Sequence, residues 1–117
     1  MGASAMTAEA LVLVVEGDEY LSSVRCNLLQ KAGYKTIQAA TGMDGLRSVD
    51  EFNPDLVLLD AVLPDSDGIE VCRKIKTNSK DSKSYVVLLW SVKTYSESEA
   101  WDSENGADGD RRYHYRC

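Results

Sequence analysis

Nearly continuous apolar runs recur along the chain and alternate with more polar stretches. Three of them are ALVLVV at residues 10–15, DLVLLD at 55–60 and YVVLLW at 85–90. Such runs are typical of strands that are buried on both faces, as in a parallel sheet. A shorter strand-like segment, YKTIQA, lies at 34–39 between the first two. The pattern therefore predicts four strands and a mainly parallel sheet.

Helical spacing is found between these strands. The expected inward face of the first helix consists of Leu21, Val24, Leu28 and Ala32. Gly33 stands where a helix C-cap is expected, and Thr41 can cap a second helix over 42–52. Further helices are expected over 68–76 and 96–104. Alternation of strands and helices predicts a doubly wound open α/β sheet with right-handed crossovers.

Length and charge limit the organisation and the partners of the chain. We expect one domain at 11–110, a flexible N-terminal segment at 1–10 and an atypical tail at 111–117. The net charge of -6 would repel a phosphate backbone, so direct nucleic-acid binding is not expected. The apolar runs are too short to span a membrane, which favours a cytoplasmic protein.

Acidic residues stand where the strands are predicted to end. Glu16, Gly17 and Asp18 follow the first strand, and Asp60 closes the third. In open α/β sheets, ligands bind at the carboxyl ends of the strands, so the carboxylates should meet there. Neighbouring carboxylates repel, and a hard divalent cation such as Mg²⁺ is the usual remedy. Glu19 is better explained as a favourable charge at a helix N-terminus.

Three stretches together resemble the receiver domain of two-component response regulators. They are LVVEGDEYL, PDLVLLDAVLPDSDGIEVCRKIK, and VVLLWSVKT followed by ENGADG, and the likeness runs from about Leu11 to Gly109. The central stretch is the most specific, because Asp60 closes an apolar strand and Pro64, Asp67 and Gly68 follow in the next loop.

The resemblance implies a fold and a chemistry. The fold would be flavodoxin-like, a five-stranded parallel sheet in the order 2-1-3-4-5. Asp60 would accept a phosphoryl group from a sensor histidine kinase or phosphotransfer protein. Mg²⁺ would be held by Asp60, the main-chain carbonyl of Val62 and an acidic residue after the first strand.

The sequence departs from the family pattern at the metal. Gly17 occupies the position that resembles the direct metal ligand. We expect Glu16 to reach the metal instead, with Asp18 as the alternative ligand and loss of the metal as the third outcome. Because even a lost supporting partner costs metal affinity, we expect weakened Mg²⁺ binding.

Further departures lie towards the C-terminus. Ser91 falls at the hydroxyl position that would bond the phosphoryl group, or Trp90 if the register shifts by one. Tyr113 stands where the family has a lysine. The polar ending DRRYHYRC predicts an atypical fifth strand and no final helix. Apolar surface left bare in this way would favour self-association, so a homodimer is an open alternative.

Two functions follow from these expectations. The first is a phospho-accepting receiver, which is no enzyme beyond catalysing its own phosphorylation and dephosphorylation, and which signals through a conformational shift to an output domain or protein. The alternative is a degenerate pseudo-receiver, a protein interaction module that works without phosphorylation. Gly17 and Tyr113 both favour that alternative.

Overall fold

Strands and helices alternate along the chain in the computed structural model, which describes residues 10–78, 84–90 and 113–116. The elements are β1 (Leu11–Val15), α2 (Glu19–Lys31), β2 (Lys35–Ala39), α3 (Gly42–Phe52), β3 (Leu56–Asp60), α4 (Gly68–Asn78), β4 (Tyr85–Trp90) and β5 (Tyr113–Arg116). The four strands and the first three helices predicted from the sequence are confirmed. The helix predicted at 96–104 lies outside the described residues.

The strands form one sheet in the order β2-β1-β3-β4-β5. β1 runs parallel to both β2 and β3, and β3 runs parallel to β4. Parallel neighbours require long crossover connections, which α2, α3 and α4 provide in turn. The predicted parallel arrangement of these four strands is therefore confirmed.

The fifth strand differs from the expectation. β5 pairs with β4 in the antiparallel direction, with Tyr113 opposite Trp90 and Arg116 opposite Val87. A sheet of five parallel strands was therefore the wrong prediction at this edge. The segment YHYR lacks the apolar run of a strand buried on both faces, whereas an antiparallel edge strand tolerates one solvated face. The absence of a final helix and the domain bounds stay predictions.

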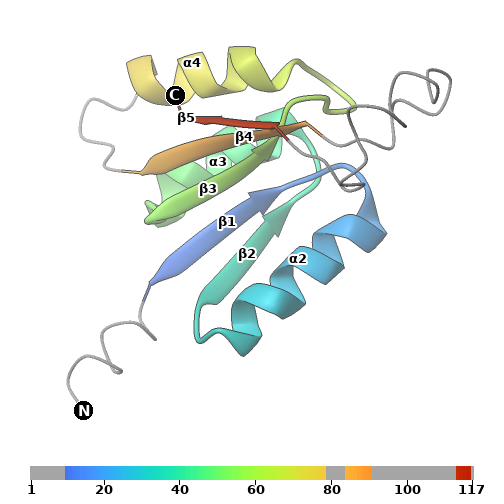
Figure 1. Ribbon diagram of the computed structural model, residues 1–117. Helices are drawn as coiled ribbons and strands as arrows, with labels where there is room; N and C mark the ends of the chain where they lie inside the picture. Colours follow the sequence, from blue (N-terminus) through green and yellow to red (C-terminus); the bar gives the residue numbers. More distant parts are fainter. Residues whose placement is uncertain (1–9, 79–83, 91–112, 117) are drawn as a thin grey trace, which may run out of the picture.

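Helices cover both faces of the sheet, as a doubly wound fold requires. Figure 1 shows α2 on one face, over β1 and β2, and α3 with α4 on the other. Successive residues of β1 point to opposite faces, so Leu13 and Val15 join the larger core cluster under α3 and α4. Val12 and Val14 pack with Cys26 of α2 in a smaller cluster on the other face.

The buried face of α2 is not the predicted one. Ser22 and Cys26 are its buried residues, whereas Leu28 is 63% exposed. Leu21 and Val24 are only half-buried. Leu29, which the prediction left out, packs against the cluster of Val12, Val14 and Cys26. The face that meets the sheet is therefore rotated away from the predicted one.

Within the described part of the chain, every helix lacks the length and the apolar character of a membrane span.

Candidate acidic site at the carboxyl edge of the sheet

Two carboxylates meet where β1 and β3 end. Val15 lies opposite Leu59 in the parallel register, so the next residues, Glu16 and Asp60, are neighbours across the edge. Both are buried, with 2% of Glu16 and 4% of Asp60 exposed. The structure thus brings together the two acidic residues that the strand ends pointed to.

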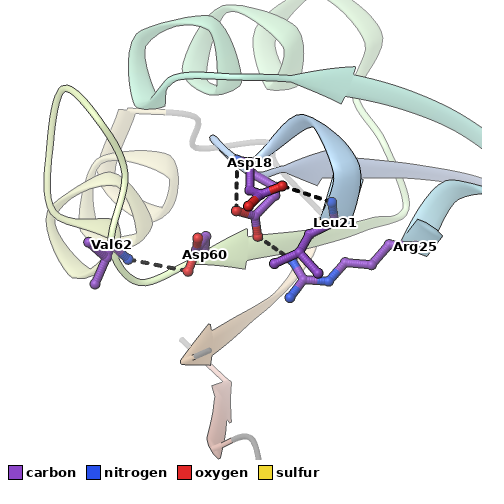
Figure 2. Close-up of polar contacts among 6 residues, drawn as sticks. Asp18, Leu21, Arg25, Asp60 and Val62 are labelled. Carbon is purple, nitrogen blue, oxygen red and sulfur yellow. Dashed lines mark hydrogen bonds and ion pairs between the residues drawn. The ribbon is translucent and has the colours of Figure 1, made fainter. Parts of the chain in front are cut away.

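Asp60 is held at the turn into the next loop. The N–H of Ala61 donates to the carbonyl oxygen of Leu89 on β4 at 2.8 Å, which fixes the backbone beside it. The N–H of Val62 points back at the Asp60 Oδ1, at a distance of 3.4 Å (Figure 2). This contact restrains the carboxylate, while the side chain of Val62 itself is exposed.

The surroundings of Asp60 favour its neutral form. Burial, as the largest cause, and the neighbouring Glu16, through hydrogen bonding and charge, together raise the pKa of the Asp60 carboxyl to about 7. The Val62 N–H and the Arg25 charge act in the opposite direction but do not outweigh those effects. With a pKa near neutrality, Asp60 is only partly ionised at neutral pH, and added positive charge beside it would favour the carboxylate.

Glu16 has a cationic partner that the sequence analysis missed. Its Oε1 lies 2.6 Å from the Nη1 of Arg25, and the side chains are 1% and 13% exposed respectively. Its Oε2 accepts a hydrogen bond from the Asp18 N–H at 3.0 Å. Both oxygens of Glu16 are therefore engaged, one of them in a nearly buried ion pair.

The position of Arg25 on α2 explains how it reaches the site. Arg25 lies four residues after Leu21, so both side chains are on the same side of the helix. Helical side chains lean towards the helix N-terminus, which here is the end beside Glu16. In Figure 2 the Arg25 side chain extends from α2 towards the end of β3, where Asp60 lies. In the sequence, a long basic side chain two helical turns after the acidic cluster was the signal that could have indicated this ion pair.

Asp18 serves as the N-cap of α2. Its backbone is extended, and its Oδ1 accepts a hydrogen bond from the Leu21 N–H at 3.1 Å. Such a cap satisfies one of the free N–H groups at a helix start. Glu19 is the first residue of the same helix, in keeping with its interpretation as a helix N-terminal charge.

Gly17 lies against the loop that follows Asp60. A Cβ atom placed on Gly17 would lie 2.8 Å from Cδ and 3.2 Å from Cγ of Pro64. The first distance is shorter than any normal carbon contact, and a proline ring has little freedom to move away. A side chain at this position therefore requires the 61–67 loop to shift.

The loop is also attached to the start of α3. Asp65 accepts hydrogen bonds from the N–H groups of Gly42, at 2.7 Å, and Met43, at 3.1 Å. The Gly42 N–H is the main cause that lowers the pKa of the Asp65 carboxyl. At the other end of the loop, the Gly68 N–H donates to the Ala61 carbonyl at 2.8 Å. These contacts fix the position of Pro64 relative to Gly17.

The described oxygen donors at this edge do not form a ready site for Mg²⁺. Among the described residues, no group of three or more acidic, histidine or cysteine side chains is placed to hold a metal ion. Gly17 contributes no carboxylate, and both oxygens of Glu16 have partners. Mg²⁺ demands near-ideal oxygen coordination. The residues as arranged here do not fit the cation, and they would do so only after Glu16 leaves Arg25.

Two of the remaining predicted site residues, Trp90 and Tyr113, lie at the same edge of the sheet. Trp90 ends β4 and is half-buried, and the backbone of Tyr113 is its partner on β5. Ser91 lies outside the described residues. The hydroxyl position and the effect of Tyr113 therefore stay predictions.

Comparison with known proteins yields one family. The model of the response regulator receiver domain matches residues 12–108. The transcriptional regulatory protein AfsQ1 of Streptomyces coelicolor is 40% identical over 97 residues, which are 83% of this chain and 41% of that protein. The DNA-binding response regulator MtrA of Mycobacterium tuberculosis is 33% identical over 102 residues, 87% of this chain and 43% of MtrA. The chain thus spans about two fifths of the length of these curated relatives.

A solved structure agrees with the sequence relatives. The response regulator TrrA of Thermotoga maritima, in complex with Mg²⁺-BeF, has a TM-score of 0.61 and is 30% identical. The similarity covers 66% of this chain and 65% of that one.

Proposed function

The chain belongs to the response regulator receiver domain family, and on that premise we propose that Asp60 accepts a phosphoryl group from a sensor histidine kinase or phosphotransfer protein. Receiver domains are generally signalling domains and not enzymes. Any catalysis by this chain would be limited to its own phosphorylation and dephosphorylation. The phosphorylated form would signal through a conformational shift.

The position of Asp60 carries this proposal. It is a buried carboxylate at the carboxyl edge of a parallel sheet, next to Glu16 and Arg25. In the reaction, an oxygen of Asp60 would form a bond to the phosphorus of a phosphohistidine. The phosphorus–nitrogen bond would break, and its electron pair would stay on the imidazole. The ionised carboxylate is the reactive form.

Receiver domains generally bind Mg²⁺, and the TrrA complex contains it. When bound, the cation supplies positive charge beside the transferred phosphoryl group. For this chain we propose weakened Mg²⁺ affinity. Two observations support it: Gly17 lacks a carboxylate, and Glu16 is paired with Arg25. Glu16, Asp60 and the Val62 carbonyl remain the proposed ligands, with Asp18 as the alternative.

The proposed partners rest on the family and on the fact that this chain matches only about two fifths of its curated relatives. Response regulators work with histidine kinases and output domains, and MtrA is named as DNA-binding. That property belongs to a protein more than twice as long as the matched segment. For this chain alone, we propose no direct nucleic-acid contact. An output partner, a cytoplasmic location and a homodimer also stay proposals.

Incubation with acetyl phosphate, with and without Mg²⁺, tests the proposal by intact mass. We expect the gain of one phosphoryl group in the wild type and none in Asp60→Asn. Asp50→Asn is the matched control, because Asp50 is an exposed aspartate on α3 and should leave the gain unchanged. A gain that persists in Asp60→Asn would contradict the proposal.

The second candidate is the pseudo-receiver that binds a partner without phosphorylation. The ion pair between Arg25 and Glu16 favours it, because the acidic site already contains a cation. No mass gain in the wild type, with either acetyl phosphate or a kinase, would support this candidate.

A further inference from the structure

We propose that Arg25 is the resident counter-cation of the acidic site, and that a divalent cation binds there only by displacing Arg25 from Glu16. The inference concerns the cation step of the proposed function. It assigns to α2 a role that the acidic residues alone do not suggest.

The ion pair between Arg25 and Glu16 is short and buried. The Nη1 of Arg25 lies 2.6 Å from Oε1 of Glu16, and both side chains are almost withdrawn from solvent. A carboxylate as buried as Glu16 is stable in its charged form only with a partner. Arg25 is that partner, and it provides one of the positive charges that a metal would otherwise provide.

The ion pair is also incomplete. Arginine can bind a carboxylate through two parallel hydrogen bonds, but here only Nη1 contacts Glu16. The other oxygen of Glu16 accepts from the Asp18 N–H. The Nη2 of Arg25 is buried and has no hydrogen-bond partner within the described part of the chain. A guanidinium held by one contact, with an unsatisfied donor, is easier to displace than a bidentate one.

Glu16 and Asp60 share one edge of the sheet. Glu16 and Asp60 follow the paired residues Val15 and Leu59, so a cation that bridges both carboxylates must approach the oxygens of Glu16. Arg25 already engages one of these oxygens. Cation and guanidinium cannot both neutralise the same carboxylate at full strength, so their binding is mutually exclusive or strongly antagonistic.

Cation affinity measured by calorimetry, with no phosphodonor present, tests the inference. The variant Arg25→Met keeps a long side chain but removes the charge. We expect it to bind Mg²⁺ about tenfold more tightly than the wild type, the scale on which neighbouring groups tune metal sites. The same affinity as the wild type, or a weaker one, would overturn the inference. Because phosphorylation is not involved, failure here leaves the role of Asp60 untouched.

Arg47→Met is the matched control. It removes the same charge from an exposed pair with Asp44 on α3, so Mg²⁺ affinity should stay close to the wild-type value. An equal gain in both variants would mean that net charge alone is responsible, and this result would also overturn the inference.

A measurement on the wild type covers the case in which Arg25→Met does not fold. The side-chain N–H signals of Arg25 can be followed by NMR during a Mg²⁺ titration. Displacement predicts that these signals move as the site fills and then exchange faster with water. Arg25 signals that stay unchanged while the cation binds would contradict it.

Discussion

At the scale of single residues, the burial of Asp60 makes folding stability depend on pH. The folded-state pKa of Asp60 is raised to about 7, from an ordinary value of 3.8. Between these values the folded chain holds a proton that the unfolded chain has lost. The Asp60 contribution to stability is therefore full below about pH 4 and is lost as pH rises towards 7.

Asp60→Asn removes this dependence. Without added metal at pH 8, we expect the variant to be more stable than the wild type by about 2 kcal/mol. This is roughly half of the full linkage energy, because the amide that replaces the carboxyl is itself a buried polar group with its own desolvation cost. Urea unfolding at several pH values measures the difference, which should close near pH 4. A difference that does not change with pH would contradict the raised pKa.

Gly17 gives a second residue-scale prediction. Gly17→Asp introduces a side chain whose Cβ meets the Pro64 ring. We expect it to destabilise the fold by about 1 to 3 kcal/mol, as overpacking does. Pro64→Ala removes the ring atoms that cause the conflict, so the cost should shrink in the double variant.

A double-mutant cycle by urea unfolding separates these effects. The change caused by Gly17→Asp is compared with and without Pro64→Ala, which cancels the effect of the proline itself. Strictly additive costs would show that the contact with Pro64 is not the origin of the strain.

The sequence indicated part of this residue-scale picture. Glu16 and Asp60 could be paired because both end apolar strands, and strand ends meet at one edge. For the ion pair with Arg25, a basic residue two turns after the acidic cluster was a signal, but the pairing itself depends on how α2 is rotated about its axis. The contact between Gly17 and Pro64 was equally hidden, since it joins two loops that are distant in sequence.

At the scale of elements, the junction between β3 and α4 depends on Gly68. A Cβ on Gly68 would meet the Asp60 carbonyl oxygen and would lie 2.7 Å from the Ala61 Cα. Both are backbone atoms that cannot rotate away. The start of α4 can therefore approach the end of β3 only with glycine at this position.

Gly68→Ala should cost more than about 2 kcal/mol of stability and should lower phosphoryl acceptance, because the strain falls on the backbone of Asp60. Gly33→Ala is the comparison. Gly33 has a φ of 100° and no atom near its Cβ position, so alanine there should cost about 1 kcal/mol and leave acceptance unchanged. Chemical denaturation and intact mass measure the two effects. Equal losses of acceptance in both variants would contradict the role given to Gly68.

Helix and strand positions were largely predictable, whereas the orientation of α2 was not. The Thr41 cap was predicted, and its side chain accepts a hydrogen bond from the Asp44 N–H. For α2, the apolar spacing predicted a face that includes Leu28, but the sheet is met by Ser22, Cys26 and Leu29. Because Ser22 and Cys26 are small and only weakly apolar, this face gives a weaker hydrophobic pattern in the sequence than the predicted one.

At the scale of the whole molecule, the parallel order of four strands follows from alternating apolar runs and helices. The direction of β5 does not, because YHYR carries no pattern that distinguishes a parallel edge from an antiparallel one. The family resemblance suggested the parallel direction and was wrong here. The acidic edge is unaffected, since Glu16 and Asp60 lie on β1, β3 and their loops.

The identity of the phosphorylated residue is the most direct test of the proposed function. Borohydride reduction of the acetyl phosphate-treated chain converts an aspartyl phosphate to homoserine, and peptide mass spectrometry then locates it. We predict homoserine at position 60, and only after treatment with the phosphodonor. Homoserine at another aspartate would contradict the assignment of Asp60, and its absence from the whole chain would favour the pseudo-receiver.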